Sequence, residues 1–439
     1  MPTTPPRRSV QLALGVVCMV AISSPQYVWA LFTQPLMTSL GVSLARVQIT
    51  FSILIVIQTF LSPSQGVLVD RFGPRLLLSI GAVLAGLSWV LAAGVTSLTG
   101  LYLTYGLLGG LGTGIVYVGV IGHMVQCFPD RRGLATGVAA AGYGMGAIVT
   151  TFPIAQAIRA SGHRRALFEF GIGLAIVALA AAQGLERQRA TRTALVDDAR
   201  SVRPAEMLRS PAFWLMFVMM TMMSTSGLMV TSQMGAFTRD FGMADATLLG
   251  VAVLPLALSL DRLTNGLTRP FFGWVSDRIG RETTMVVAFA LEGTAMTVWL
   301  LTRSHPALFV LLSGVVFFGW GEIFSLFPAT LTDTFGPAFA TANYGCLYMA
   351  QGVGSVLGGP VAALLHELTG SWTVVFGAAI AMDFTTAALA HFALKPLRRQ
   401  WIDGAKVPGA GVPGAGVPGA EVPSAVKGAR DGVPIGNLR

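Results

Sequence analysis

Six ionisable residues lie inside long apolar stretches in the second half of the chain: Asp261, Arg262, Arg269, Glu292, Glu322 and Asp383. A charge within a segment of membrane-spanning length is expensive and marks a candidate functional site. Arginine is the natural anchor for a carboxylate, because its guanidinium donates two parallel hydrogen bonds and stays charged at any cellular pH. The two arginines therefore indicate binding of a small organic anion.

Arg269 is the strongest candidate. It lies eight residues before the polar end of its segment at Asp277, a distance of about 12 Å along a helix, toward mid-membrane depth. The alternative is an arginine that snorkels or bonds a helix carbonyl. Arg262 lies seven residues earlier, two turns along the same helix face. The two arginines would suit both ends of a dicarboxylate; equally, Asp261 or Glu322 would neutralise Arg262 as a structural ion pair.

Glu322 and Asp261 are the candidates for proton coupling. A carboxylate beside a bound anion repels it unless the acid pairs with an arginine or carries a proton. Glu322 is therefore consistent with proton-coupled carriage of a monocarboxylate and also with a structural pair.

The composition shows which elements must carry these residues. Of the 439 residues, 53% are hydrophobic and 11% are charged, and the mean hydropathy is +0.68, which excludes an ordinary soluble domain. A spanning helix needs about 20 mostly apolar residues. We expect an all-α membrane protein with twelve transmembrane helices in two six-helix pseudo-symmetric halves, near residues 10–34, 44–69, 76–95, 100–123, 132–158, 166–184, 211–237, 246–274, 283–301, 306–328, 340–366 and 372–394.

The charged segments divide the chain further. We expect a cytoplasmic N-terminus (1–9), a six-helix bundle (10–185), a solvated cytoplasmic linker (186–210), a second bundle (211–395) and a disordered tail (396–439) that repeats Val-Pro-Gly-Ala-Gly. Lys and Arg concentrate in the short loops on one side, so both termini are expected in the cytoplasm. The net charge of +9 then reflects topology and contact with the lipid bilayer, not nucleic-acid binding.

A glycine- and charge-containing box occurs twice at an offset of 207 residues. Gln26 and Gln233 share this offset, as do Tyr117 and Phe324, so the halves are expected to be parallel repeats. We expect the Asp and Arg of each box to pair across a short cytoplasmic loop and to act as a gate. The gating residues are Gly66, Asp70, Arg71 and Gly73 in the first copy and Gly273, Asp277, Arg278 and Gly280 in the second.

Aromatic residues form the other candidate wall of the site. The positions of the first half that correspond to the six intramembrane charges carry no ionisable group. Six aromatic residues are candidates for a cage around a small planar carboxylate, although each is equally explained by packing: Tyr27, Tyr117, Tyr143, Trp320, Phe324 and Tyr348.

The duplicated box, the twelve segments and the central linker resemble the major facilitator superfamily over about residues 8–395. Within it, the strings QYVW at 26–29, FPDRRGLA at 128–135, AGYG at 141–144 and RPFFG at 269–273 are similar to the oxalate:formate antiporter group and its monocarboxylate transporter relatives. The resemblance implies secondary transport by alternating access, with Arg269 holding the substrate carboxylate. It also implies that Glu292 and Asp383, on peripheral helices, are structural.

Residue 351 departs from that group. The antiporter carries a second cation, a lysine, where this chain has Gln351, and no lysine precedes Lys395. Loss of that ammonium weakens the case for a tightly bound oxalate dianion. It favours a monoanion, or a dianion held by Arg262 and Arg269.

The leading hypothesis is thus an antiporter of small carboxylates, with a proton-coupled monocarboxylate symporter as the alternative. An enzyme is not expected, because the histidines lack catalytic contexts. Cys18, Cys127 and Cys346 lie far apart, so we expect no disulfide, metal or cofactor. A transporter-like sensor is a third possibility, supported only by the tail. The absence of an Asn-x-Ser/Thr acceptor fits a bacterial inner membrane, and we expect a monomer.

Overall fold

The structure, a computed structural model, describes residues 8–42, 44–187, 201–243, 245–248 and 250–404, and is almost entirely helical. The first group of helices contains α1 (Arg8–Tyr27), α2 (Trp29–Leu40), α3 (Leu44–Phe60), α4 (Ser62–Phe72), α5 (Pro74–Ala92), α6 (Leu98–Leu101), the π-helical η1 (Tyr102–Leu108), α7 (Gly109–Cys127) and α8 (Arg132–Gln183). The long α8 comprises two helices, because Gly162 with φ of 83° breaks it.

The second group begins with the short α10 (Pro204–Met207) and α11 (Pro211–Asp240). A hairpin of β1 (Thr247–Leu248) and β2 (Val251–Ala252) follows. The remaining elements are α12 (Val253–Ile279), α13 (Arg281–Leu301), α14 (Pro306–Trp320), α15 (Ile323–Phe335), α16 (Ala340–Val356), η2 (Leu357–Val361), α17 (Ala362–Thr369), α18 (Trp372–Leu389), η3 (Ala390–Leu394) and α19 (Lys395–Gly404).

The predicted fold class, an all-α membrane protein of twelve spans, is confirmed. Among the described residues, ten helices are long and apolar enough to cross a membrane, and the pair α3–α4, bent by 49°, counts as an eleventh if it forms one span. The twelfth span, α12, is less apolar because it carries Asp261, Arg262, Arg269, Asp277 and Arg278. Its charges are tolerated because it packs between α8 and α14.

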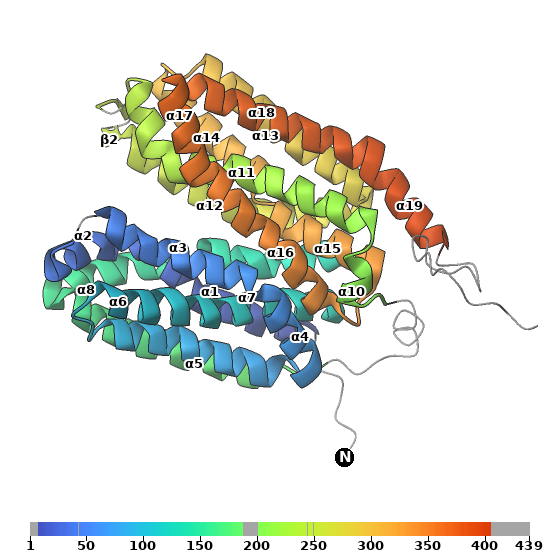
Figure 1. The fold of residues 1–439 in the computed structure, drawn as a ribbon, viewed down its shortest axis with the longest axis horizontal. Helices are drawn as coiled ribbons and strands as arrows, with labels where there is room; N and C mark the ends of the chain where they lie inside the picture. The colour runs from blue at the N-terminus through green and yellow to red at the C-terminus, as the bar shows by residue number, and fades with distance from the viewer. Residues whose placement is uncertain (1–7, 43, 188–200, 244, 249, 405–439) are drawn as a thin grey trace, which may run out of the picture.

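The two groups of helices meet at one end and diverge at the other (Figure 1). We call the first the linker end, since it holds Arg8, α10 and α19, and the second the hairpin end, since it holds α2 and β1–β2. Contacts between the groups are made chiefly by α8 with α12 and α15 and by α16 with α3, α4 and α7. The interface therefore runs from the linker end toward the middle of the molecule.

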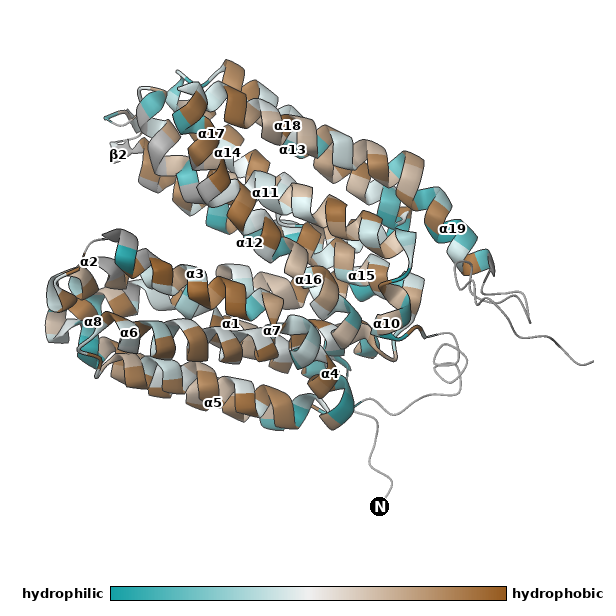
Figure 2. Ribbon diagram, in the orientation of Figure 1, coloured by the Kyte–Doolittle hydropathy of each residue, from teal (hydrophilic) through white to brown (hydrophobic). Residues whose placement is uncertain are grey.

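Small residues bring the helices close together. A Cβ on Gly112 of α7 would lie 2.4 Å from the Ala85 nitrogen of α5, and one on Gly86 would lie 2.3 Å from the Ala175 side chain of α8. Such close approaches are how helices pack where lipid removes the hydrophobic driving force. Many large apolar side chains are exposed on the outer surface, and the hydrophilic residues lie mainly toward the ends of the helices, as at α4 and α19 (Figure 2).

Several predicted boundaries are wrong. The eighth span begins at Val253, not 246, because Thr247–Ala252 forms the hairpin. The first span breaks at Val28 and continues to Leu40.

The predicted tail and linker also contain packed structure. α19 continues to Gly404, and its buried Arg398 pairs with Glu282 and donates to Thr334. Within the predicted solvated linker, Met207 is buried, and the Val202 N–H donates to the Phe335 oxygen. The Val-Pro-Gly-Ala-Gly repeats lie outside the described residues.

We predict that deleting residues 405–439 leaves the protein as stable as the full chain, whereas deleting residues 396–439 lowers its melting temperature by about 5 °C. The longer deletion removes Arg398 and leaves the partly buried Glu282 without its partner. Thermal unfolding of both truncated proteins in detergent measures this difference. Equal melting temperatures would show that α19 contributes nothing to the fold.

Candidate functional site

Arg269 lies in α12 at the contact between the two groups of helices and is only 1% exposed. Its Nη1 donates to the Ala140 oxygen of α8, and its Nη2 donates to Asn265 Oδ1, both at 2.7 Å. The guanidinium also lies over the Phe324 ring, 4.4 Å from its centroid. The sequence analysis considered an arginine that bonds a helix carbonyl, and the bond to Ala140 is of this kind. It uses only one of the N–H groups of the Arg269 guanidinium. Arg269 is therefore a buried cation held by neutral groups.

Four of the predicted aromatic residues form one cluster at this interface. Tyr117 stacks on Tyr348 with ring centroids 4.8 Å apart, and Tyr143 packs edge-on against Tyr117 at 5.0 Å and against Tyr27 at 5.4 Å. Gln58 of α3 donates to the hydroxyl oxygens of Tyr143 and Tyr348. The cluster thus joins α1, α3, α7 and α8 of the first group to α16 of the second.

Hydrogen-bond donors without acceptors distinguish this cluster from ordinary packing. Within the described chain, Arg269 Nε is buried without a hydrogen-bond partner. The hydroxyls of Tyr117 and Tyr344 make no hydrogen bond of regular geometry, but they interact with each other, and Tyr117 also interacts electrostatically with Arg269. Buried donors normally have acceptors. This arrangement is therefore suited to donate hydrogen bonds to the oxygens of an anion.

Two further candidates lie at the edge of the cluster. Trp320 packs edge-on against Phe324 at 5.7 Å, so it is one ring removed from Arg269. Gln351 is buried, and its Oε1 has no partner among the described residues. Gln351 therefore presents an amide, with no positive charge, at the edge of the site.

Arg262 interacts electrostatically with the adjacent Asp261 but forms no close ion pair with it. Its Nη1 donates to the Tyr27 oxygen at 3.2 Å, and none of the ion pairs between described residues joins it to Asp261 or Glu322. Both carboxyl oxygens of Asp261 are buried, and the carboxyl group interacts with the Ser313 side chain. Arg262 thus links the two groups on the hairpin side of Arg269.

Three buried acids lie together behind Arg269. Glu322, at the junction of α14 and α15, has no hydrogen bond to either carboxyl oxygen and interacts electrostatically with Arg269 and Asp383. The Ser226 hydroxyl lies 3.2 Å from both Glu292 Oε1 and Asp383 Oδ2. One hydroxyl has a single proton to donate, so Ser226 cannot give both acids a full hydrogen bond. The acids read as peripheral from the sequence therefore adjoin the candidate site.

The sequence reasoning missed Asn265, Gln58 and Tyr344. Gln58 and Asn265 are separated by 207 residues, the repeat offset, and both are buried amides. Tyr344 shares a helix face with Tyr348 and Gln351, since the spacing is four and then three residues. The offset and the helical spacing were both available to find them.

At the linker end, the aspartates of the two boxes that are predicted to act as a gate accept hydrogen bonds from helix N-termini of the opposite group. Asp70 Oδ2 accepts the Ala342 N–H of α16 at 2.9 Å. Asp277 accepts the Gly133 and Leu134 N–H groups of α8 at 3.1 and 2.9 Å. Anionic groups are stabilised at helix N-termini by free N–H groups and the helix dipole. Each contact crosses between the groups, so the pair holds the linker end closed.

The predicted pairing of Asp with Arg is present in the second box, which runs from Gly273 to Arg281, whereas no ion pair between described residues involves Asp70 of the first box. The Arg71 guanidinium lies beside the Phe72 ring and that of Arg278 over the Trp274 ring, while Asp277 pairs with Arg281 four residues later. Both box aspartates are directed at helix N-termini, whose N–H groups have no other partner in the helix.

The box glycines permit this geometry. A Cβ on Gly66 would lie 2.5 Å from the Thr341 oxygen, and one on Gly273 would lie 2.2 Å from the Gly133 oxygen, so both allow the groups to touch. Gly73 and Gly280 turn the chain at φ of 91° and 94°, values that other residues rarely adopt. The repeat found in the sequence is therefore also present in the structure.

The second copy of the gate carries extra charges. Asp333 Oδ1 accepts from Arg132 of the first group at 2.5 Å, and Oδ2 accepts from Arg281 at 2.8 Å. At the corresponding position of the first copy, 207 residues earlier, Gln126 makes longer contacts of 3.4 Å with Asp70 and the Pro337 oxygen. The contact around Asp277 is therefore the stronger of the two.

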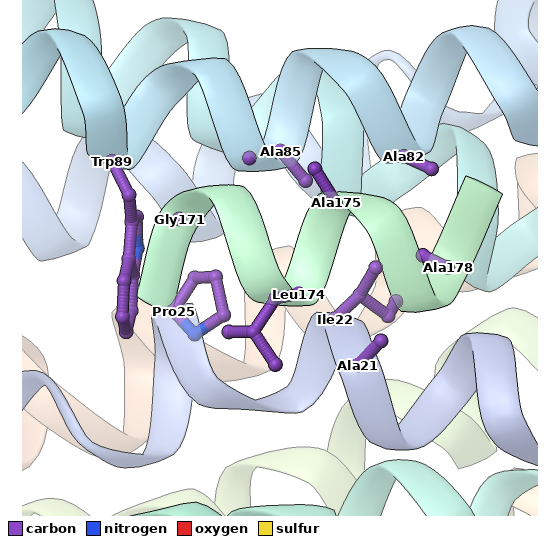
Figure 3. Close-up of a pocket in the computed structure, with 11 residues that line it drawn as sticks. Ala21, Ile22, Pro25, Ala82, Ala85, Trp89, Gly171, Leu174, Ala175 and Ala178 are labelled. Carbon is purple, nitrogen blue, oxygen red and sulfur yellow. The ribbon is translucent and has the colours of Figure 1, made fainter. Parts of the chain in front are cut away.

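A small void between α1, α5 and α8 is not a second site. It has a volume of about 10 Å³ and is lined by apolar residues such as Ile22, Trp89 and Leu174 (Figure 3). About one water fits such a space, and an apolar lining offers it no partners.

The family follows from a match over almost the whole chain. A family model described as Major Facilitator Superfamily matches residues 12–260 and 251–414. The chain belongs to the major facilitator superfamily. The members to which it is similar are transporters rather than enzymes.

Relatives within this superfamily carry small carboxylates by name. The chain is 34% identical over 391 residues to the oxalate:formate antiporter of Oxalobacter formigenes, covering 88% of this chain and 92% of that protein. It is 27% identical over 337 residues to monocarboxylate transporter 13 of Bos taurus, covering 76% of each. The fold matches that of the proton:xylose symporter XylE with a TM-score of 0.65 at 14% identity, over 90% of this chain and 99% of the other.

We predict that Asp70→Ala loosens the linker end. The substitution leaves the Ala342 N–H without its charged acceptor, a loss worth about 1.5 kcal/mol or more. A cysteine at buried Thr341, in a protein whose three native cysteines are replaced, should then react with a maleimide roughly tenfold faster.

Asp130→Ala is the matched control, because Asp130 is an exposed acid at the same end that pairs with Arg8. Its labelling rate should equal that of the parent. Equal rates in both variants would contradict the assignment of Asp70 to the gate.

Proposed function

We propose that the protein is a secondary active transporter that exchanges small carboxylate anions by alternating access, in the manner of an oxalate:formate antiporter. The observation that carries the proposal is the buried Arg269, which is hydrogen-bonded only to neutral groups and lies beside tyrosine hydroxyls that make no hydrogen bond of regular geometry. A carboxylate would supply both the negative charge and the acceptors that these donors lack.

The orientation proposed from the loop charges assigns the linker end to the cytoplasm. The Asp70 and Asp277 contacts then close the cytoplasmic side, while the groups diverge on the other side. In this state the site would be reached from outside, and rocking of the halves would break the two contacts and release substrate inward. We place the protein in a bacterial inner membrane as a monomer.

The charge of the site favours an ion with one carboxylate near Arg269. Gln351 supplies no second cation, and Arg262 is bonded to the Tyr27 oxygen. Binding of a dianion would require Arg262 to exchange that carbonyl for a carboxylate. A monoanion such as formate needs no such rearrangement.

Proton-coupled symport of a monocarboxylate is the second candidate function. It is favoured by Glu322, whose unpaired carboxyl group interacts electrostatically with Arg269. Glu292 and Asp383 lie behind it, both in contact with the Ser226 hydroxyl, so a proton on one of the acids would have nearby acceptors. A proton on Glu322 would remove its repulsion of the bound anion.

The proposal is tested in liposomes that contain the purified protein. We predict uptake of labelled oxalate or formate that depends on internal counter-substrate, and at least tenfold slower uptake in Arg269→Lys, because a point charge cannot replace the guanidinium fork. Counterflow measured over the first seconds gives both rates.

Arg46→Lys is the control, since Arg46 is exposed at the hairpin end and should transport normally. Equal uptake by both variants would refute the role of Arg269. Absence of carboxylate uptake by the unmodified protein would refute the function.

Gln351→Lys should increase oxalate binding relative to formate by about tenfold, because it restores a cation at the edge of the site. Competition of each anion against labelled substrate measures the ratio. An unchanged ratio would show that position 351 does not set the charge preference.

Glu322→Gln should retain exchange but lose any stimulation by an inward proton gradient, because an amide cannot carry the coupled proton. Uptake at two external pH values with a fixed interior measures the stimulation. Stimulation equal to that of the parent would exclude Glu322 as the proton carrier, and loss of exchange as well would assign it to substrate binding.

A further inference from the structure

A groove of about 540 Å³ opens at the linker end between the α4–α5 turn and the end of α8. Its polar lining includes Arg75, Ser79, Gln183, Glu186 and Arg187. Two arginines against one glutamate give this lining a net charge of +1. The groove is remote from the aromatic cluster, and the transport mechanism does not use it.

The two arginines are fixed in place yet retain free donors. Arg75 Nε donates to the backbone carbonyl oxygen of Leu185 at 3.2 Å, and Arg187 Nη2 donates to the backbone carbonyl oxygen of Asp70 at 3.1 Å. The remaining guanidinium N–H groups have no partner among the described residues. No carboxylate there forms an ion pair with either arginine. The groove thus presents positive charge with donors to spare.

The groove adjoins the apolar outer face of α5 and α8. Leu76 lines it and is 53% exposed, and Ile80 and Val83 continue the same exposed strip along α5. Ile176 and Val177 are exposed on the neighbouring part of α8. A molecule with an anionic head and apolar chains would match both parts of this surface.

The second half of the chain shows the same position occupied by protein. Residue 282 follows Arg75 by the repeat offset of 207, and it is a glutamate. Glu282 pairs with Arg398 of α19, which packs against this end of α13 and α15. The charge is therefore neutralised internally in one half, whereas in the other half no described residue forms an ion pair with Arg75.

We propose that this groove binds the phosphate headgroup of an anionic phospholipid, with its acyl chains along α5 and α8. Arg75 and Arg187 donate to the phosphate, and Ser79 and Gln183, which bond each other at 2.8 Å, lie at the boundary with the acyl chains. The bilayer supplies this ligand at high local concentration. The site is independent of the carboxylate transported.

Native mass spectrometry of the full-length protein in detergent tests the proposal, with phosphatidylglycerol and phosphatidylcholine of identical chains as probes. We expect one phosphatidylglycerol to bind more tightly than phosphatidylcholine. Arg75→Gln/Arg187→Gln should weaken that binding about 30-fold, since each arginine near the lipid surface is worth about 1 kcal/mol.

Arg209→Gln/Arg399→Gln is the matched control, because it removes the same charge from exposed arginines at the same end. It should bind within about twofold of the parent. Equal losses in the two double variants would indicate diffuse attraction and overturn the site. If the Arg75→Gln/Arg187→Gln protein does not fold, Arg187→Gln alone should weaken phosphatidylglycerol binding about fivefold. No loss of binding in that single variant would overturn the site.

Inorganic phosphate distinguishes a lipid headgroup from a free anion. Millimolar phosphate should leave the bound phosphatidylglycerol in place, because it lacks the apolar chains. Complete displacement by phosphate, or equal binding of phosphatidylcholine, would contradict the proposal.

Discussion

The structure depends on one costly feature, a guanidinium buried at the interface of two helix groups inside a membrane. Arg269 is stabilised by the Ala140 carbonyl, the Asn265 amide and the Phe324 ring, none of which carries a negative charge. Such a charge is tolerated only where neighbouring groups and a bound partner compensate for lost hydration. The surrounding helices can be understood as the support that places this cation where both halves reach it.

The gate and the site share the same interface. α12 carries both Arg269 and Asp277, so separation of α8 from α12 at the linker end would also disturb the Ala140 contact of Arg269. On the proposed function, occupation of the site and closure of the linker end would be coupled through two packed helices, without a longer pathway between them. At Gly66 and Gly273 the backbones of the two groups touch directly. A close-packed interface of this kind cannot be stretched gradually, so the groups are either in contact or separated.

Patterning along the chain predicts the spans, the repeat and the importance of Arg269, because each depends on local composition or on a fixed offset. The partners of Asp70 and Asp277 could not be predicted, since the Ala342 and Gly133 amides become available only when the halves are assembled. The association of Glu322 with Glu292 and Asp383 was missed for the same reason, as three separate helices bring them together. Gln58 and Asn265, in contrast, were predictable from the offset alone.

Thermal unfolding of the purified protein with added ligand tests the central claim most directly. A ligand that binds only the folded protein at about 100 times its Kd adds about 2.7 kcal/mol of stability. The account predicts that formate or oxalate raises the melting temperature of the parent but not of Arg269→Lys, and that xylose raises neither. An equal rise in the melting temperatures of both proteins, or no rise with any small carboxylate, would contradict the claim that Arg269 binds the carboxylate.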